Sequence, residues 1–135
     1  MFTASHRAYA DAVLDFLDPH QEYIDYRLYR EHCVQTKDKI YMKDLRVLGN
    51  RDLHKVTIID NHVYSFGFQL DNGIPILPFY NDKEDIELKL LISYFKKLKK
   101  CKDVRSVHRK HFEFSELLHK NIENFVRFYE RDSDD

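Results

Sequence analysis

Two pairs of polar residues stand where the ends of apolar strands would place them in a binding site. Asp60 and Asn61 directly follow the β-branched run 56–59, and they offer the hard oxygen ligands that suit Mg²⁺. Thr3 and Ser5 lie between a short first strand and the helix that follows it, where a hydroxyl and backbone N–H groups form an anion site. Ligands in open α/β sheets bind outside the carboxyl ends of the strands. Both pairs are therefore candidate functional residues, although Asp-Asn is also common in turns and Ser5 also suits a helix N-cap.

Three other groups of residues are weaker candidates. Lys43 follows an apolar stretch, so it either brings a positive charge to a phosphate or is a solvated lysine on a hairpin. A Cys-His site within residues 30–33 is less expected than a structural role, because adjacent residues of a strand point to opposite faces. His108 and His111 have the i, i+3 spacing of two metal ligands on a helix, but no third ligand is evident. None of these groups carries a functional assignment by itself.

The most basic stretch of the chain is the segment 96–110. It holds eight lysine and arginine residues against one acid, Asp103. We interpret it either as a solvated helix end or as a docking surface for an acidic or phosphorylated protein partner. The whole chain has 22 Lys and Arg against 23 Asp and Glu, so no overall field attracts nucleic acid or an anionic membrane. We expect neither direct nucleic-acid binding nor a membrane partner.

Length and composition favour one globular domain. The chain has 135 residues, of which 43% are hydrophobic and 33% charged, and this balance is typical of a folded protein. Its three glycines are too widely spaced for a glycine-rich phosphate-binding loop. Its two cysteines are far apart in sequence, which argues against a disulfide framework and favours a reducing compartment.

The hydrophobic pattern of the first half predicts a helix and a hairpin around the candidate residues. The helix runs from an N-cap at Ser5 to Asp18-Pro19, because the residue before a proline is pushed out of the helical region. Alternating residues predict a strand over 23–30, and a polar turn at 36–39 predicts a hairpin with a second strand at 40–42. The apolar positions of the helix are Ala8, Ala12, Val13, Phe16 and Leu17.

The second half predicts strands followed by helices. The run 56–59 has no polar face, which indicates a parallel strand buried on both sides. Pro75 within the run 74–77 indicates an edge strand, since proline cannot donate to a ladder. An amphipathic helix is predicted from Asp82 to Lys100, and a second amphipathic stretch follows an N-cap at Ser115. The apolar faces of these helices hold Ile86, Leu88, Leu91, Ile92, Phe95 and Leu98, and then Phe114, Leu117, Leu118, Ile122, Phe125 and Val126.

Several blocks of the chain match the motifs of one known family in order and spacing. They are residues 2–5 (Phe-Thr-Ala-Ser), 9–11, 17–19, 27–33 (Arg-Leu-Tyr-Arg-Glu-His-Cys), 42–45 (Met-Lys-Asp-Leu), 50–53, 58–61 (Ile-Ile-Asp-Asn) and 72–76. These blocks resemble the small phosphatases of the RNA polymerase II C-terminal domain, which belong to the haloacid dehalogenase superfamily. The match continues to about Leu118, where residues 103–105 and 112–118 look like the tail of the longer "phosphatase-like 2" members. The resemblance therefore implies a domain over residues 1–118, followed by a helical extension and a frayed acidic tail over 119–135.

The resemblance implies a Rossmann-like sheet and a two-step phosphoryl transfer. One aspartate attacks the phosphorus of phosphoserine or phosphothreonine, a second protonates the leaving oxygen and activates water, and Mg²⁺ offsets charge on the phosphate. By matching position, Thr3 would hydrogen-bond a phosphate oxygen and Lys43 would stabilise the phosphoaspartate. Asp60 and Asn61 would hold Mg²⁺ directly or through water.

The resemblance also implies where a phosphoprotein or phosphopeptide substrate would bind. Ser5 belongs to the same block as the phosphate-binding Thr3. Tyr9 and Arg30 match positions beside the peptide groove of the family. These three residues are therefore expected on the substrate side of the site.

The chain departs from the family pattern in two places. The two catalytic aspartates of the family lie in an Asp-x-Asp-x-Thr motif upstream of the block at 2–5, and this sequence contains no such motif. The metal motif continues with His62-Val63 in place of Ser-Pro. The expected fold is a partial Rossmann-like α/β haloacid dehalogenase fold that lacks its first central strand, with a β-hairpin insertion and C-terminal helices. Because the motif is absent, we expect the chain to be N-terminally truncated and to use Mg²⁺ only when the motif is supplied. Strands beside a missing strand keep unpaired backbone groups, so we also expect the chain to be unstable alone.

Three functions are compatible with the resemblance. The first is a Mg²⁺-dependent protein serine/threonine phosphatase. The second is a catalytically dead module that still binds phosphopeptides. The third, less expected, is a peptide-binding domain like that of the presequence-translocase receptor of the mitochondrial inner membrane. The expected location is nuclear or cytoplasmic, with a mitochondrial location less expected.

Overall fold

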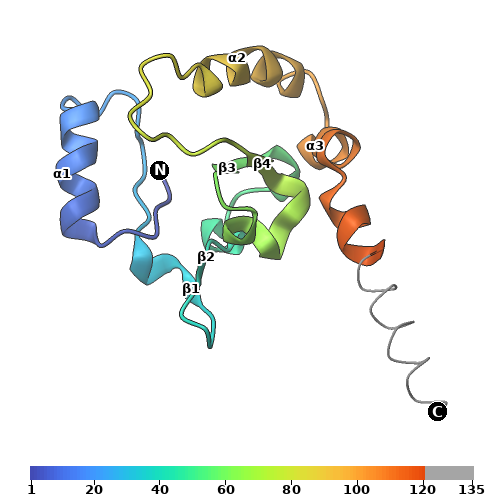
Figure 1. Ribbon diagram of the computed structural model, residues 1–135, viewed down its shortest axis with the longest axis horizontal. Helices are drawn as coiled ribbons and strands as arrows, with labels where there is room; N and C mark the ends of the chain where they lie inside the picture. Colours follow the sequence, from blue (N-terminus) through green and yellow to red (C-terminus); the bar gives the residue numbers. More distant parts are fainter. Residues whose placement is uncertain (121–135) are drawn as a thin grey trace. The chain divides into compact units, whose positions relative to one another are not determined.

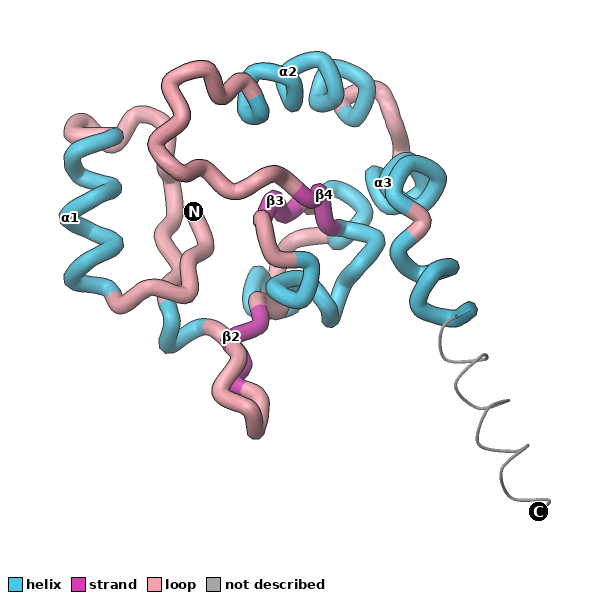
Figure 2. Tube along the Cα trace, in the orientation of Figure 1, coloured by secondary structure: helices cyan, strands magenta, loops and turns pink. Residues whose placement is uncertain are grey.

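Residues 1–120 are described by the computed structural model, whose helices and strands are labelled in Figure 1. The chain divides into two units. The first unit contains residues 1–51 together with 62–69, and the second contains residues 52–61 together with those from 70 onward. The chain contains both helices and strands, which Figure 2 distinguishes by colour, as expected of a mixed α/β protein.

The first unit begins with a parallel bridge between Phe2 and Leu28. The N–H of Thr3 donates to the carbonyl of Leu28 at 2.9 Å, and the N–H of Leu28 donates to the carbonyl of Met1 at 2.8 Å. The expected first strand is therefore present as this single bridge. The strand predicted over 23–30 is wrong, because Leu28 is the only residue of that segment in a β-bridge within the described chain.

The Asp18 carboxylate explains why the start of that segment is not a strand. It accepts backbone N–H groups from Glu22, Tyr23 and Ile24 at 2.9, 3.1 and 2.9 Å. These donors are therefore used locally and do not enter a sheet ladder. The three bonds also lower the pKa of Asp18, while its burial opposes the shift.

Helix α1 (Arg7–Leu17) begins two residues after Ser5, with His6 at the N-cap position. The predicted N-cap at Ser5 is wrong, because Ser5 forms a turn in which its N–H donates to Thr3 Oγ1 at 3.1 Å. The buried residues of the helix are Ala10 and Leu14. The predicted apolar positions lie outside that face, since Val13, Phe16 and Leu17 are 39%, 84% and 63% exposed.

Polar side chains fasten α1 to residues 27–29. The Arg27 guanidinium donates to Asp11 at 3.0 Å and to Asp15 at 2.7 Å, and the Tyr29 hydroxyl donates to Asp11 at 2.6 Å. The Tyr29 side chain is buried, with 4% exposed. Arg27 and Tyr29, two alternate residues of the segment 23–30, therefore reach a helix rather than a sheet.

A hairpin forms around the predicted polar turn, and its second strand is confirmed, but that strand pairs with residues 34–35 and not with the predicted strand 23–30. Strand β1 (Val34–Gln35) pairs antiparallel with β2 (Tyr41–Met42) in the register Val34↔Met42 and Gln35↔Tyr41. The turn closes when Thr36 donates its N–H to the Ile40 carbonyl at 2.9 Å. Three short 3₁₀ helices surround it in the chain, at Arg30–His32, Leu45–Leu48 and Leu53–Lys55.

The second unit contains the parallel strand pair. Strand β3 (Ile58–Asp60) pairs with β4 (Gly73–Pro75), and the 3₁₀ segment Val63–Asn72 connects them. The buried strand predicted at 56–59 is confirmed, shifted toward the carboxyl end. Within the described residues this sheet has two strands, with Asp60 opposite Pro75. The larger Rossmann-like sheet and its missing central strand remain predictions.

Helices α2 (Glu87–Leu98) and α3 (Val104–Phe112) complete the core of this unit. Ile74, Leu98 and Val104 are buried together, and Ile59 and Leu91 pack against them. The predicted helix start at Asp82 is wrong, because the carboxylates of Asp82 and Asp85 accept the N–H groups of the residues two positions on and form turns. Part of the predicted apolar face of α2 is exposed, including Leu88 at 69% and Ile92 at 56%.

The last helical stretch starts before its predicted cap. Residues 114–120 are helical, so Ser115 lies inside the helix, and its hydroxyl donates to Asp71 at 2.7 Å. Glu113, with φ of 53°, ends α3 just before this stretch. The predicted apolar residues Ile122, Phe125 and Val126, with most of the 119–135 extension, lie outside the described residues.

We expect the second unit to lose stability in mild acid through His108. This side chain is 1% exposed, its Nδ1 contacts the Asp71 carbonyl at 3.0 Å, and it stacks on Tyr94. Burial lowers the pKa of His108, so the unfolded chain binds the proton more tightly than the folded chain. The free energy of unfolding should therefore fall as the pH drops below about 6.5.

Hydrogen exchange of α3 amides between pH 5 and pH 7, corrected for intrinsic rates, measures this loss. The variant His108→Leu should remove much of the pH dependence, whereas His20→Gln, at an exposed histidine, should keep it. Equal pH dependence in His108→Leu and the parent chain would contradict the assignment.

We expect Asp44 to stabilise the first unit at neutral pH. Its carboxylate accepts from Arg46 and from Gln69, and these bonds lower its pKa to about 2. The stability it contributes is complete above the unfolded value of about 3.9 and is lost as the pH falls toward 2. Asp44→Asn should cost about 1 kcal/mol at pH 7, because the exposed Arg46 guanidinium is partly screened by solvent.

Denaturant unfolding of Asp44→Asn at pH 7 and at pH 2 checks this expectation. The difference from the parent chain should disappear at the lower pH. Asp38→Asn, at an exposed turn position, is the matched control and should be neutral at both pH values. A deficit of Asp44→Asn that persists at pH 2 would show that the charge is not responsible.

Candidate functional site

The two units divide the predicted site residues between them. Asp60 and Asn61 belong to the second unit. The others belong to the first unit and are Thr3, Ser5, Tyr9, Arg30 and Lys43. The structure therefore gives the geometry of two groups of residues, one likened to phosphate and substrate binding and one to metal binding.

Thr3 stands directly after the bridge between Phe2 and Leu28. Its N–H completes that bridge, and its hydroxyl oxygen accepts the N–H of Ser5 at 3.1 Å. The hydroxyl hydrogen is not used in this bond, so Thr3 can still donate to an anion. Thr3 and Ser5 are half-buried, and both are held by main-chain bonds rather than by a helix cap.

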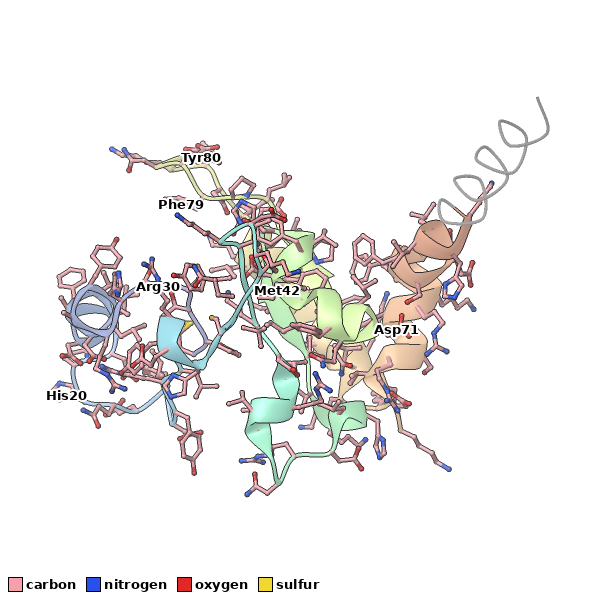
Figure 3. The ribbon with its side chains drawn as sticks, turned by 90° about the horizontal axis from the view of Figure 1, so that it is seen from below. His20, Arg30, Met42, Asp71, Phe79 and Tyr80 are labelled. Atoms are coloured by element: carbon pink, nitrogen blue, oxygen red, sulfur yellow. The ribbon has the colours of Figure 1, made fainter. Side chains whose placement is uncertain are left out.

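Arg30, labelled in Figure 3, is bonded to the same short loop. Its backbone N–H donates to the Ser5 carbonyl at 3.1 Å, and its Nε donates to the Ala4 carbonyl at 2.6 Å. Its guanidinium also lies over the Tyr41 ring, 4.8 Å from the centroid. The structure thus brings Thr3, Ser5 and Arg30 together, while their roles in phosphate and substrate binding stay predictions.

Tyr9 is placed on the first turn of α1, where its side chain is 67% exposed. Arg7, on the same turn, pairs with Glu31 at 2.9 Å and lies over the Tyr29 ring. Tyr9 is therefore available to a peptide on the surface of the first unit. Its contact with a substrate stays a prediction.

Lys43 follows β2 directly and is only 8% exposed. Its N–H donates to the Ser65 carbonyl at 2.6 Å. A Cβ on Gly67 would lie 2.8 Å from the Cε of Met42, so the segment 62–69 lies directly against β2. The alternative of a solvated hairpin lysine is wrong, because this segment covers the end of the strand.

Asp60 and Asn61 stand at the carboxyl end of β3. The Asp60 side chain is buried, with the residue 9% exposed, and its carbonyl accepts the N–H of Ile76 at 3.2 Å. Asn61 is exposed. One carboxylate and one amide suit Mg²⁺, which binds few protein oxygens and keeps several waters and phosphate oxygens as ligands. The described residues contain no group of three His, Cys, Asp or Glu that would form a fuller cage.

The other sequence candidates have structural roles in the described part of the chain. His32 Nδ1 accepts the N–H of Tyr29 at 3.0 Å, which supports a structural reading of residues 30–33. His108 is buried against Tyr94, and His111 is exposed. The fuller metal site that these two histidines would need is not formed by residues 1–120.

The basic segment 96–110 is partly neutralised. Arg105 pairs with Asp103 at 2.8 Å, and Arg109 pairs with Asp71 at 2.8 Å. The lysines of the segment are exposed. Its role as a docking surface stays a prediction.

Sequence reasoning missed several groups of the site. The Ala4 carbonyl and the Tyr41 ring fix Arg30, and the Ser65 carbonyl fixes Lys43. Every residue has a backbone carbonyl, so the residue type cannot identify the one that accepts a hydrogen bond. The Tyr41 ring lies on a different element from Arg30, so its contact could not be read from the spacing. His6, whose imidazole contacts Arg30, was also missed because histidine next to a cap residue has no distinctive spacing.

A family model described as "NLI interacting factor-like phosphatase" matches residues 1–105. The chain is 48% identical over 118 residues to "CTD small phosphatase-like protein 2" of Dictyostelium discoideum, covering 87% of this chain and 20% of that protein. It is 43% identical over 126 residues to "CTD small phosphatase-like protein 3" of Caenorhabditis elegans, covering 88% of this chain and 43% of that protein.

A third relative has a different printed role. The "Mitochondrial import inner membrane translocase subunit TIM50" of Candida glabrata is 36% identical over 119 residues, covering 87% of this chain and 24% of that protein. No helix within residues 1–120 is both long and apolar enough to cross a membrane. This chain thus spans less than half the length of each of these three relatives. The family model covers most of the chain, and the chain belongs to the NLI interacting factor-like phosphatase family.

Proposed function

We propose that this chain is part of a Mg²⁺-dependent protein serine/threonine phosphatase of the C-terminal-domain small phosphatase type. One observation supports the proposal most directly: Thr3 and Asp60 each stand at the carboxyl end of a parallel strand segment, and Lys43 is buried directly after β2. The carboxyl end of a parallel strand, where Thr3 and Asp60 lie, is the position at which α/β proteins bind their ligands. The printed names of the relatives, which are phosphatases in most cases, agree with this reading.

Each residue has a distinct part in the proposed reaction. The Thr3 hydroxyl donates to a phosphate oxygen, and the Lys43 ammonium offsets the negative charge of the phosphoryl group. Asp60 and Asn61 would hold Mg²⁺, which supplies further positive charge to the phosphate when bound. Ser5, Tyr9 and Arg30 bind and orient a phosphoserine or phosphothreonine peptide.

The nucleophile and the acid/base group are the missing parts. The chain has no Asp-x-Asp-x-Thr motif, so none of its residues takes these two roles in the proposed reaction. We infer that the natural protein carries the motif ahead of Phe2 and that this chain is truncated. The larger size of the relatives supports this inference. The phosphoprotein substrates proposed for it would be nuclear or cytoplasmic.

A second candidate function is peptide binding without turnover. The similarity to a mitochondrial import subunit favours it, because that protein's printed name describes a translocase component and not a hydrolase. A phosphopeptide module that has lost its nucleophile would keep the contacts of Thr3 and Arg30. Affinity for phosphopeptides without hydrolysis by the complete natural protein would identify this function.

We expect Lys43 and Thr3 to contribute to phosphopeptide affinity. Thr3→Ala removes a hydrogen bond to a charged group, and Lys43→Met removes a charge while filling the same buried space. Each should weaken binding of a fluorescent phosphoserine peptide by about ten- to a hundredfold, as measured by anisotropy. Circular dichroism confirms that each variant is folded.

Two control variants match these changes. Lys37→Met alters an exposed lysine of the hairpin turn, and Thr57→Ala alters a threonine of the second unit. Both should bind the phosphopeptide as the parent chain does. The proposal fails if Lys37→Met weakens binding as much as Lys43→Met, or if the parent chain does not prefer the phosphorylated peptide.

We expect the 135-residue chain to bind a phosphopeptide but not to hydrolyse it. Phosphate release should appear only with the longer natural protein, should require Mg²⁺ and should stop when EDTA removes the metal. The intact mass of the endogenous protein from its native cells should exceed 16.4 kDa, with peptides containing Asp-x-Asp-x-Thr. Mg²⁺-dependent hydrolysis by the 135-residue chain itself would contradict the assignment of the nucleophile.

A further inference from the structure

A histidine and an arginine meet beside the proposed phosphate-binding loop. Arg30 NH1 lies 2.7 Å from Nε2 of His6, the residue that precedes α1. His6 is exposed, and Arg30 is half-buried. A guanidinium has no acceptor, so Nε2 of His6 accepts the hydrogen bond and the ring N–H lies on Nδ1 in this contact.

No carboxylate balances this pair among residues 1–120. The polar partners of the Arg30 side chain are the Ala4 carbonyl and the His6 ring. The neighbouring acid, Glu31, pairs with Arg7 at 2.9 Å instead. The Arg30 charge is therefore directed at neutral groups, although a carboxylate or phosphate is the partner whose geometry a guanidinium matches best.

The Arg30 guanidinium is also held in place. Its Nε bond to Ala4 and its position over the Tyr41 ring fix the plane of the group. These two contacts use one of its five N–H donors, and the His6 contact uses a second. A fixed guanidinium with remaining donors binds an anion at lower entropic cost than a mobile side chain.

The pair of Arg30 and His6 is linked to Thr3 by hydrogen bonds of the loop between them. Ser5 links the two, since its N–H donates to Thr3 Oγ1 and its carbonyl accepts the Arg30 N–H. An extended peptide with a phosphate at Thr3 would therefore place a neighbouring side chain near His6 and Arg30. The site thus offers two adjacent positions for negative charge.

We propose that Arg30 and His6 form a subsite for an anionic side chain next to the phosphorylated residue, which makes acidic phosphopeptides the preferred substrate class. The anion is a carboxylate of Asp or Glu, or a second phosphate. Arg30 donates to it, and His6 offers a second donor through its Nδ1–H, since its Nε2 accepts from Arg30. This inference rests on the proposed function, because it takes Thr3 as the phosphate-binding residue.

Binding of matched peptides to the full 135-residue chain tests the subsite. A phosphoserine peptide without other charges is compared with peptides that carry Glu, Gln or a second phosphoserine at each flanking position in turn. Glu should bind at least about threefold more tightly than Gln at one flanking position, and the difference should shrink in high salt. The peptide with a second phosphoserine distinguishes the two sources of the anion, because it should bind more tightly than the Glu peptide only if the subsite favours phosphate.

The outcomes separate this inference from the proposed function. If the parent peptide binds and Glu equals Gln at every position, the subsite is wrong and the phosphate-binding role of Thr3 stands. If the chain binds no phosphopeptide better than the unphosphorylated peptide, both are wrong. A Glu preference that is equal at all flanking positions would indicate general attraction and would also overturn the subsite.

Two variants locate the effect. His6→Gln keeps an acceptor for Arg30 but removes the imidazole ring, so the ratio of Gln-peptide to Glu-peptide dissociation constants should fall. Arg7→Gln removes a charge from the next residue, one already paired with Glu31, and should preserve the ratio. The subsite is overturned if Arg7→Gln lowers the ratio as much as His6→Gln does.

Discussion

The pairing of residues 1–5 with residues 28–30 is the constraint on which the first unit depends. Three main-chain bonds make it: Thr3 N–H to Leu28, Leu28 N–H to Met1, and Arg30 N–H to Ser5. They decide where the Thr3 hydroxyl stands and where α1 begins. They also bring the Arg30 side chain to the loop that it stabilises. A few backbone bonds thus place every anion-binding group that we assign to this part of the unit.

Two consecutive side chains, Asp71 and Asn72, hold the segments of the second unit together. Asn72 is 2% exposed, and its amide donates to the carbonyls of Leu53 and Val56 at 2.6 and 2.7 Å. Asp71 accepts hydrogen bonds from α3 and from the helical stretch after it. The start of β4 is therefore tied both to the residues that lead into β3 and to the helices. This arrangement fixes the strand end that carries Asp60.

Aspartate side chains account for several of the differences between the expected and observed elements. Asp18 satisfies three N–H groups that a strand would have needed, and Asp82 and Asp85 form turns where a helix was expected. Asp103 caps α3, a helix that the sequence pattern did not separate from its neighbours. An aspartate carboxylate accepts the N–H groups of residues two to six positions later, and these N–H groups are then not available to a strand or helix. The spacing of apolar residues gives no sign of these hydrogen bonds.

The sequence by itself determined the family, the polar turn at 36–39 with the short strand after it, and the buried parallel strand that leads to Asp60, because motif order, turn residues and β-branched runs are local properties of the chain. It also named Thr3, Lys43 and Arg30 as site residues. Only the tertiary structure decided that Lys43 is buried under residues 62–69 and that Arg30 meets His6 and the Ala4 carbonyl. These contacts join residues far apart in sequence through backbone carbonyls and ring faces, which no residue type announces. The burial of Lys43 and the partners of Arg30 therefore depend on how the whole chain packs.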